Sequence, residues 1–318
     1  TACQVSEYLV HPATALHGAD PAVASPDGAE SLVVWVGGSH DVELVTQGIY
    51  GRRFDAWGEP LEEPHLLNEY PEGGWPSLVF RSFPQVAMAE TGQSIVVWEV
   101  EVELADIAPG IYGRLLDSQG TPVGAEFQVS QVAALAPRVA MDGAGGFVVV
   151  WQDSKLDGDG WGIFGRRFDP DGNALGDSFQ INTSTQLDQA HPRVAASDAG
   201  AFIVSWSSWN GIPRGTYARW YDEDGVPQTG EVALSSQAAL SAVAMTADGT
   251  SVVVWAQQCD DDFDSCLLAQ VFAPAATASG PIVEVNRNPE RGQGPSEVCL
   301  KDDGSFVVAW VGWSPGQV

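Results

Sequence analysis

Acidic residues recur at close spacing in a segment that directly follows a strongly apolar run. In the stretch VVVWQDSKLDGDGW, Asp153, Asp157 and Asp159 come after the run that ends at Trp151. Carboxylates spaced in this way can converge on a hard cation, and calcium takes about six to eight oxygen ligands. The closing Glu of a full calcium loop is absent, so a polar Asp-Gly hairpin turn is the competing interpretation.

A second acidic loop, CDDDFDSC, is bounded by two of the four cysteines. Its carboxylates are comparable candidates for calcium ligands: Asp260, Asp262 and Asp264. An even number of cysteines predicts disulfides in an exported chain, and the interval here differs from the Cys-x-x-Cys spacing of zinc sites. We expect a disulfide between Cys259 and Cys266 that closes this loop, which leaves Cys3 to pair with Cys299.

Histidines offer a different metal chemistry, because neutral imidazole suits copper and zinc. Three of the five histidines lie near the start of the chain, at His11, His17 and His40. They can meet if the segments that carry them are neighbours, which predicts a copper or zinc site. Their spacing is not tight, so surface histidines are the competing interpretation.

Four tryptophans lie in segments that we expect to be loops: Trp75, Trp161, Trp209 and Trp313. An exposed indole can stack on a sugar ring while a neighbouring carboxylate accepts hydrogen bonds from the sugar hydroxyls. These four residues are therefore the candidate ligand-binding tryptophans.

Linear motifs for a nucleophile, a catalytic metal or a phosphate site are missing from the sequence. It lacks G-x-S-x-G, H-E-x-x-H, a phosphate loop and the Ser-x-Asp-x-Gly-x-Thr-Trp box of sialidases. The main interpretation is therefore non-catalytic, and we name no catalytic residue. A hydrolase or lyase whose acids and histidines line a channel stays open as an alternative.

The charge balance excludes two classes of partner. The chain has 42 Asp and Glu residues against 14 Lys and Arg residues, a formal net charge of −28. Such a surface repels nucleic-acid phosphates and anionic lipids. An apolar run of about 18 residues, which a membrane helix needs, is missing. The acidic composition and the four cysteines indicate a secreted protein, extracellular or at the cell surface.

A strand-like run that ends in tryptophan recurs six times. The runs SLVVW, SIVVW, FVVVW, FIVSW, SVVVW and FVVAW end at Trp35, Trp98, Trp151, Trp206, Trp255 and Trp310. Each follows a segment like PRVA and a short turn, and most precede a segment like GIFGRRFD. Alternating apolar residues and Asp-Gly turns predict four strands in each repeat of about 50 residues.

Four-stranded units of this length, repeated around a ring, are typical of a β-propeller. We predict an all-β, six-bladed β-propeller of four-stranded antiparallel blades, formed by residues 1–318 as a single domain. The blades are expected to start near residues 21, 84, 137, 192, 241 and 295. The indoles that end the second strands are expected to be buried between blades.

The two ends of the chain determine how the predicted ring closes. The opening EYLVHPATALHGADPAVAS matches EFQVSQVAALAPRVAM, so an N-terminal strand at about residues 5–11 is expected to join the last blade. By the spacing of the third repeat, about one strand of that blade is then missing. A three-stranded blade, a cut chain, or a strand donated by a partner would each account for this.

Position within the repeat separates structural residues from candidate functional ones. The arginines of the GRRFD segments recur with the repeat beside an Asp, so we expect them to pair with carboxylates. The loops after the second strands and the connections between units differ from repeat to repeat, whereas the other turns are short and alike. Variable loops on a rigid scaffold usually carry binding sites, so we expect the acidic loops and loop tryptophans on one face.

These units resemble repeats of about 50 residues, FVVVW…DG…GIFGRRFD, found in large secreted bacterial surface and calcium-associated proteins. The likeness is strongest from Pro137 to Trp206 and weaker over most of the chain. It implies an extracellular β-propeller with a binding or adhesion role, and it supplies no catalytic residues.

The main functional hypothesis is a secreted, non-catalytic binding or scaffold module. Its acidic, Trp-bearing loop face would take a cationic, metal-bridged or carbohydrate partner, so a protein or a glycan is expected. Three alternatives stay open: a metal-binding protein that uses calcium, or copper or zinc through histidines; a hydrolase or lyase with a channel site; and an assembly subunit completed by a partner strand.

Overall fold

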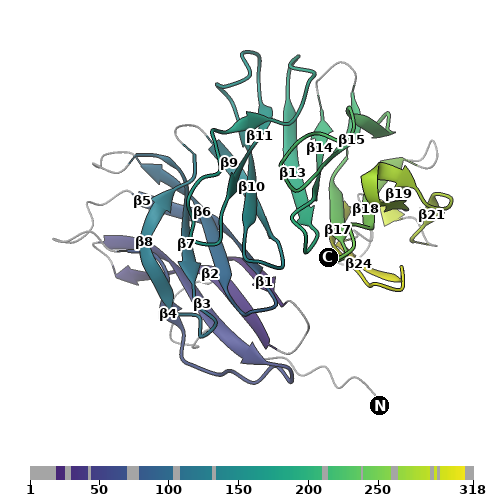
Figure 1. Cartoon of the computed structure of the whole chain (residues 1–318). Helices are drawn as coiled ribbons and strands as arrows, with labels where there is room; N and C mark the ends of the chain where they lie inside the picture. Colours follow the sequence, from purple (N-terminus) through teal and green to yellow (C-terminus); the bar gives the residue numbers. More distant parts are fainter. Residues whose placement is uncertain are drawn as a thin grey trace. The chain divides into compact units, whose positions relative to one another are not determined.

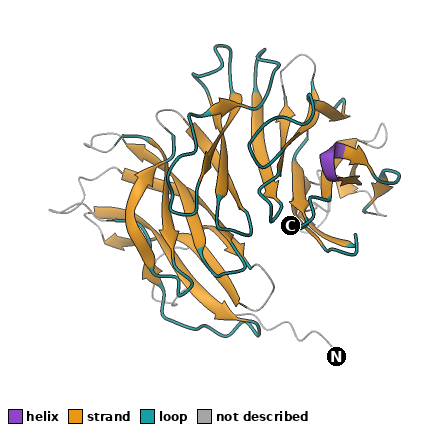
Figure 2. Ribbon diagram, viewed as in Figure 1, coloured by secondary structure: helices purple, strands orange, loops and turns teal. Residues whose placement is uncertain are grey.

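The computed structural model describes most of the chain, in the ranges 19–25, 30–41, 44–69, 79–102, 108–130, 134–209, 214–237, 239–258, 264–286, 290–291 and 294–311. Within these ranges every regular element is a β-strand, apart from the short 3-10 helix η1 (Pro274–Ala276) (Figure 2). None of these residues belongs to a helix with the length and apolar character of a membrane span.

The chain divides into two compact units, Thr1–Pro137 and Arg138–Val318. The first unit holds two four-stranded antiparallel sheets in which neighbouring strands follow chain order (Figure 1). The strands of the first sheet are β1 (Ala19–Ala24), β2 (Glu30–Asp41), β3 (Leu44–Asp55) and β4 (His65–Leu66). Those of the second are β5 (Val79–Met88), β6 (Ser94–Val102), β7 (Gly110–Leu116) and β8 (Pro122–Gln128).

The third and fourth sheets also follow chain order, and the unit boundary falls within the first strand of the third. The third sheet comprises β9 (Ala134–Met141), β10 (Phe147–Asp153), β11 (Gly162–Phe168) and β12 (Phe179–Gln180). The fourth comprises β13 (Gln189–Ala196), β14 (Phe202–Ser208), β15 (Gly215–Tyr221) and β16 (Val232–Ser235).

The fifth and sixth sheets depart from this plan. In the fifth, three short strands pair with the same neighbour, β19. Its strands are β17 (Ser241–Met245), β18 (Ser251–Gln258), β19 (Asp264–Ala273), β20 (Thr277–Ala278), β21 (Val283–Glu284) and β22 (Glu290–Arg291). Within the described ranges the sixth sheet has two strands, β23 (Gly294–Leu300) and β24 (Phe306–Val311).

The predicted all-β class and the four-stranded antiparallel sheets are confirmed. Each expected blade start lies inside a first strand, namely β1, β5, β9, β13, β17 or β23. These strands begin up to five residues earlier than expected, because a β-bulge lets the chain pair on both sides of the proline.

Buried tryptophans form the core, as predicted, in five of the six repeats. Trp98, Trp151, Trp206 and Trp255 are fully buried, and Trp35 is nearly so. The prediction is wrong for Trp310, which is 44% exposed. It lies on β24, which in the described part of the chain is the edge strand of a two-stranded sheet, so no third strand packs beside it.

The core lies between consecutive sheets. In the second unit, Val148 and Val150 of β10 and Ile163 of β11 pack in one cluster with Phe202 and Trp206 of β14. A second cluster joins Trp220 of the fourth sheet to residues of the fifth sheet. Trp98, Trp206 and Trp255 therefore each bury area against a neighbouring sheet, which holds two separate sheets together.

The recurrent arginines of the third strands act as clamps on the sheet that carries them. The Nε atoms of Arg52, Arg114, Arg166 and Arg219 each donate a hydrogen bond to a backbone carbonyl ten residues later, over 2.7, 3.3, 3.0 and 3.2 Å. The expected carboxylate pairing is present for Arg53 with Glu30 and for Arg114, whose Nη2 lies 3.2 Å from Oε1 of Glu69. The Nε bonds to backbone carbonyls are a further structural role that the sequence did not predict. A planar guanidinium can donate to a carbonyl while its face covers an aromatic ring.

The second arginine of GRRFD packs on a glycine turn of the next sheet. The Cδ atoms of Arg53 and Arg167 lie 2.8 Å from where a Cβ would stand on Gly120 and Gly225. Both glycines have a positive φ, 74° and 77°, so a side chain there would be strained and would also clash. This contact explains why the arginine and the glycine turn recur together.

We predict that truncating a buried indole destabilises the protein far more than truncating an exposed one. Trp206→Ala should lower the free energy of unfolding by about 3–5 kcal/mol, because the cavity lies in the core between two sheets. Trp57→Ala is the matched control, since Trp57 is 84% exposed, and should change it by less than about 0.5 kcal/mol. Urea unfolding followed by circular dichroism tests this, and equal changes would contradict the core assignment.

Candidate functional site

A repeated β-bulge shapes the start of the first strands. The residue before the proline of the first strand has a positive φ in four repeats: Asp20 (49°), Phe83 (50°), Ala136 (53°) and His191 (57°). This conformation is costly for a residue with a side chain, and more so before proline. Each bulge changes the direction of the side chains on either side of the proline. The same backbone conformation therefore presents a different residue in each repeat.

In the second unit these first strands bring four polar side chains into electrostatic range. We call Arg138 (β9), His191 and Arg193 (β13) and Glu297 (β23) the inner-strand cluster. Arg138 and Arg193 stand at the same repeat position, in PRVA of β9 and β13. Neither arginine is fully exposed, whereas Glu297 is exposed.

Electrostatic effects show that these side chains influence one another. Desolvation lowers the pKa of His191 below its ordinary value of 6.5, and the positive charges of Arg193 and Arg138 lower it further. Burial also lowers the pKa of Arg193, and the negative charge of Glu297 opposes that shift. Because Glu297 belongs to the sixth sheet and Arg193 to the fourth, the first strands of this unit approach a common region, consistent with the contacts of β17 with both β13 and β23.

An exposed indole lies beside the imidazole of this cluster. The rings of His191 and Trp209 meet edge to face, with centroids 6.1 Å apart and planes at 77°. Trp209 is 38% exposed. The backbone N–H of His191 donates to Oε1 of Gln152 over 3.1 Å, which ties the imidazole-bearing bulge to the neighbouring strand β10.

The DGDG segment and the connection before β13 are held together by hydrogen bonds. Gln189 N–H donates to the carbonyl of Trp161 over 2.6 Å, and Trp161 N–H donates to Oδ1 of Asp188 over 3.2 Å. Asp188 also accepts at its carbonyl from Trp209 N–H, over 3.2 Å. We call Asp157, Asp159, Trp161, Asp188 and Trp209 the loop cluster. The sequence prediction that the acidic loops and all four loop tryptophans share one face stays a prediction, since Trp75 and Trp313 lie outside the described residues.

Asp153 and Asp157 each accept hydrogen bonds from nearby backbone N–H groups. Asp153 is fully buried, and its Oδ1 accepts from the N–H groups of Lys155 and Leu156 over 2.8 and 3.2 Å. Oδ1 of Asp157 accepts from Asp159 N–H over 3.1 Å. Among the described residues no three His, Cys, Asp or Glu side chains are grouped so that they could hold a metal ion. The hairpin-turn interpretation of DGDG fits this geometry.

Several predicted residues lie outside the described ranges: Trp75, Trp313, Asp260, Asp262, His11, His17, Cys3 and Cys259. His40 and Asp264 lie in β2 and β19, and their side chains are outside the described part. Cys266 is disulfide-bonded. Cys299 is an exposed free thiol, so the expected Cys3–Cys299 disulfide is wrong. That pairing rested on elimination alone, with no spacing argument behind it.

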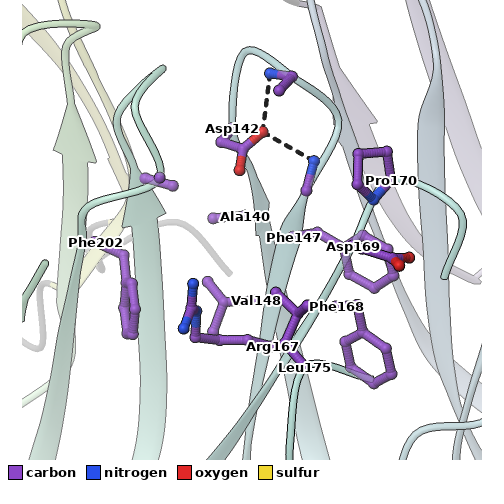
Figure 3. A pocket seen from close by; sticks show the side chains of 14 residues that line it. Ala140, Asp142, Phe147, Val148, Arg167, Phe168, Asp169, Pro170, Leu175 and Phe202 are labelled. Atoms are coloured by element: carbon purple, nitrogen blue, oxygen red, sulfur yellow. Dashed lines mark hydrogen bonds between the residues drawn. The ribbon is translucent and has the colours of Figure 1, made fainter. Parts of the chain in front are cut away.

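An apolar pocket lies between the third and fourth sheets, at the end of β13 away from His191. It encloses about 160 Å³, and Phe147, Phe168 and Phe202 are among its walls (Figure 3). Asp142 stands at its edge, with Oδ1 bound to the N–H groups of Ala144 and Gly146 (Figure 3). A pocket bounded by Arg53 and Gly120 occupies the equivalent place in the first unit. Recurrence at equivalent positions marks these gaps as a product of sheet-on-sheet packing.

Comparison with known proteins gives structural neighbours only. No protein-family model and no curated protein match the chain. A Dyadobacter fermentans protein of unknown function is 12% identical, with a TM-score of 0.62 over 97% of this chain and 93% of that one. An ulvan lyase of polysaccharide lyase family PL25 is 9% identical, with a TM-score of 0.55 over 91% and 75%. An α-L-arabinofuranosidase from Fusarium graminearum is 13% identical, with a TM-score of 0.54 over 96% and 92%.

These similarities support a β-propeller fold and correct the main functional interpretation. The similar structures of arabinan-degrading enzymes are β-propellers. The ulvan lyase and the arabinofuranosidase act on carbohydrates, so the expectation of a non-catalytic binding scaffold is contradicted. The alternative of a channel-site hydrolase or lyase agrees with them better.

Sequence reasoning missed the inner-strand cluster. The signal was present, because an arginine follows the proline of the first strand only in PRVAM and PRVAA. Those two copies were read as ordinary repeat positions, since nothing in a linear sequence shows that β9, β13 and β23 approach one another.

We predict that the stability difference between Asp153→Asn and the wild type depends on pH. Burial raises the pKa of Asp153, so the folded state holds this proton more tightly than the unfolded state. Wild-type stability therefore falls as pH rises from the ordinary value of 3.8 through the raised pKa, and the variant lacks this loss. Urea unfolding from about pH 3.5 to about pH 7 should show the free energy of unfolding of Asp153→Asn rising relative to that of the wild type. A constant difference would contradict the assignment.

The pKa of His191 gives a second prediction. In the wild type it should lie below 6.5, and Arg193→Gln should raise it by removing one of two positive charges. Nuclear magnetic resonance titration of the imidazole measures both values. Lys301→Gln removes a charge at an exposed turn and should leave the pKa unchanged. If the pKa of His191 is the same in Arg193→Gln as in the wild type, the charge of Arg193 does not act on the imidazole.

Proposed function

We propose that this protein is a carbohydrate-active β-propeller enzyme, a glycoside hydrolase or a polysaccharide lyase. The observation that carries the proposal is the edge-to-face contact of His191 with the exposed indole of Trp209, at an imidazole whose pKa is lowered by desolvation and by the charges of Arg193 and Arg138. These groups lie where variable loops meet the starts of the first strands. The likeness of the fold to arabinofuranosidase and ulvan lyase structures supports the same reading.

Each member of the site has a chemical task in this proposal. An imidazole whose pKa is lowered is neutral near pH 7, so it can accept a proton from a substrate. Trp209 offers an apolar ring face for a sugar, and Asp159 is an exposed carboxylate that can accept hydrogen bonds from hydroxyl groups. Asp188 is tied to both Trp161 and Trp209, so its part is to position the loop.

We further propose that the sheets close into a six-bladed ring, with residues 5–11 as the outer strand of the sixth blade. Six first strands recur, and similarity to β-propeller structures extends over nearly the whole chain. The exposed hydrophobic side chains of Val307, Trp310 and Val311 on β24 indicate that this sheet accepts further strands. A secreted location, a calcium site and strand donation by a partner stay proposals of the same kind.

The proposed function predicts a measurable glycan-cleaving activity that depends on the site. Purified protein should release reducing ends from at least one member of a panel of arabinan, ulvan, polygalacturonate and sialylated glycans. His191→Ala should lower kcat by about 100-fold or more, as expected for loss of an acid–base group.

Two further variants separate binding from catalysis. Trp209→Ala should raise KM more than it lowers kcat, whereas Trp57→Ala, at an exposed turn of the first unit, should change neither. Absence of cleavage across the panel, or full activity in His191→Ala, would overturn the proposal.

A further inference from the structure

The gap between the first and second sheets is larger than its counterpart between the third and fourth. It encloses about 290 Å³, against about 160 Å³ for the pocket in Figure 3. Both gaps lie at the equivalent place in the repeat, so the packing of the sheets sets where they form. The residue type differs: Ser94 stands in the first unit where Phe202 stands in the second. We call the larger gap the first-unit pocket.

The residue that begins the second strand decides how such a gap is filled. In the fourth sheet it is Phe202, whose ring stacks on that of Tyr221 with centroids 4.6 Å apart. In the fifth sheet it is Ser251, whose Oγ accepts a hydrogen bond from Nε1 of Trp220 over 3.1 Å. A ring therefore fills the position in one sheet, and a bonded hydroxyl occupies it in the other.

Ser94 has neither arrangement. It is 1% exposed, and within the part of the chain that the structure describes its hydroxyl has no hydrogen-bond partner. Arg53 stands at the repeat position of Trp220, but its guanidinium binds the carboxylate of Glu30. A buried hydroxyl without a partner costs free energy, which points to a molecule outside the chain that completes it.

The side chain of Ser94 faces the first-unit pocket. Alternate residues of a strand share a face, and Val96 and Trp98 pack in one cluster with Leu32 of the first sheet. Ser94 lies on that same face, at the start of β6, and is one of the residues that line the pocket. A serine hydroxyl rotates, so it can donate to or accept from a molecule held there.

The other walls of the pocket supply donors, acceptors and an apolar surface. The guanidinium of Arg53 donates hydrogen bonds, and the carboxylates of Glu30 and Glu90 accept them. Leu32 and Met88 present aliphatic carbon. Because Arg53 is already paired with Glu30 and Glu90 adds a negative charge, the pocket disfavours an anion.

We infer that the first-unit pocket binds a neutral sugar, either a monosaccharide or the end residue of an oligosaccharide, through Ser94, Arg53 and Glu90. A sugar needs donors and acceptors for its hydroxyl groups and an apolar surface for its C–H face, and this pocket offers all three. A small ammonium ion would use the carboxylates, but the guanidinium repels it. The residues of this pocket belong to the first unit, so the inference does not depend on the proposed function of His191 and Trp209.

Nuclear magnetic resonance titration of the full chain with galactose, arabinose and glucose tests the inference. At least one sugar should shift the backbone amide signals of Gly92 and Ser94 in a saturable way. His191→Ala should give the same shifts, so a failure to cleave any polymer leaves this inference standing. Putrescine and galacturonate, at equal concentration and ionic strength, represent the cation and the anion. The absence of a saturable shift with any sugar, or binding of either charged compound as tight as the sugar, would overturn the inference.

Two variants at Ser94 test the part played by its hydroxyl. Ser94→Ala should weaken sugar binding by about three- to tenfold, because one hydrogen bond is lost. Ser94→Phe copies the residue of the second unit and should abolish binding, because the ring fills the pocket. Binding that stays unaltered in both folded variants would overturn the inference.

Ser251→Ala is the matched control, since it removes a serine at the same repeat position. It should lower the melting temperature, because Nε1 of Trp220 loses its acceptor, and should leave sugar binding unchanged. Ser94→Ala should leave the melting temperature unchanged or slightly higher, because the hydroxyl that it removes has no partner in the described part of the chain. An equal loss of melting temperature in the two variants would assign Ser94 a structural role and overturn the inference.

Discussion

The packing of buried second-strand indoles against a neighbouring sheet is the interaction on which the rest of the structure depends. A single four-stranded sheet is apolar on its buried strands and cannot hide them alone. Trp206 packs with side chains of β10 and β11, and Trp255 packs with side chains of the fourth sheet. These contacts set the spacing between sheets, and the loops at the strand ends are placed accordingly.

The arginine clamps and buried polar caps keep each sheet in register. Buried Asn68, Asn182 and Asn286 accept from the N–H groups of Ile49, Ile163 and Leu267, over 2.7, 2.7 and 2.6 Å, each nineteen residues earlier. They satisfy backbone donors of the third strands. Because these devices recur, the scaffold is nearly the same in each repeat, and the inner-strand residues can vary without loss of the fold.

Function in this protein depends on what the scaffold leaves unused. Four third-strand arginines are engaged in clamps, turn aspartates such as Asp142 cap backbone N–H groups, and the indoles that end five of the six second strands lie in the core. Arg193, His191 and Trp209 do none of these things and lie together. The structural likeness shows the fold alone, so a function has to be argued from the residues of the site.

The repeat alone determined the all-β class, the order of strands within each sheet and the burial of five tryptophans, since period-two patterns and Asp-Gly turns are local signals. It also indicated that DGDG and Trp209 lie at loop ends. Only the tertiary structure showed that His191 and Arg193 share one region with Arg138 and Glu297. The reason is physical: a strand's sequence sets which face a side chain takes, whereas the bulge and the approach of separate sheets decide which side chains meet.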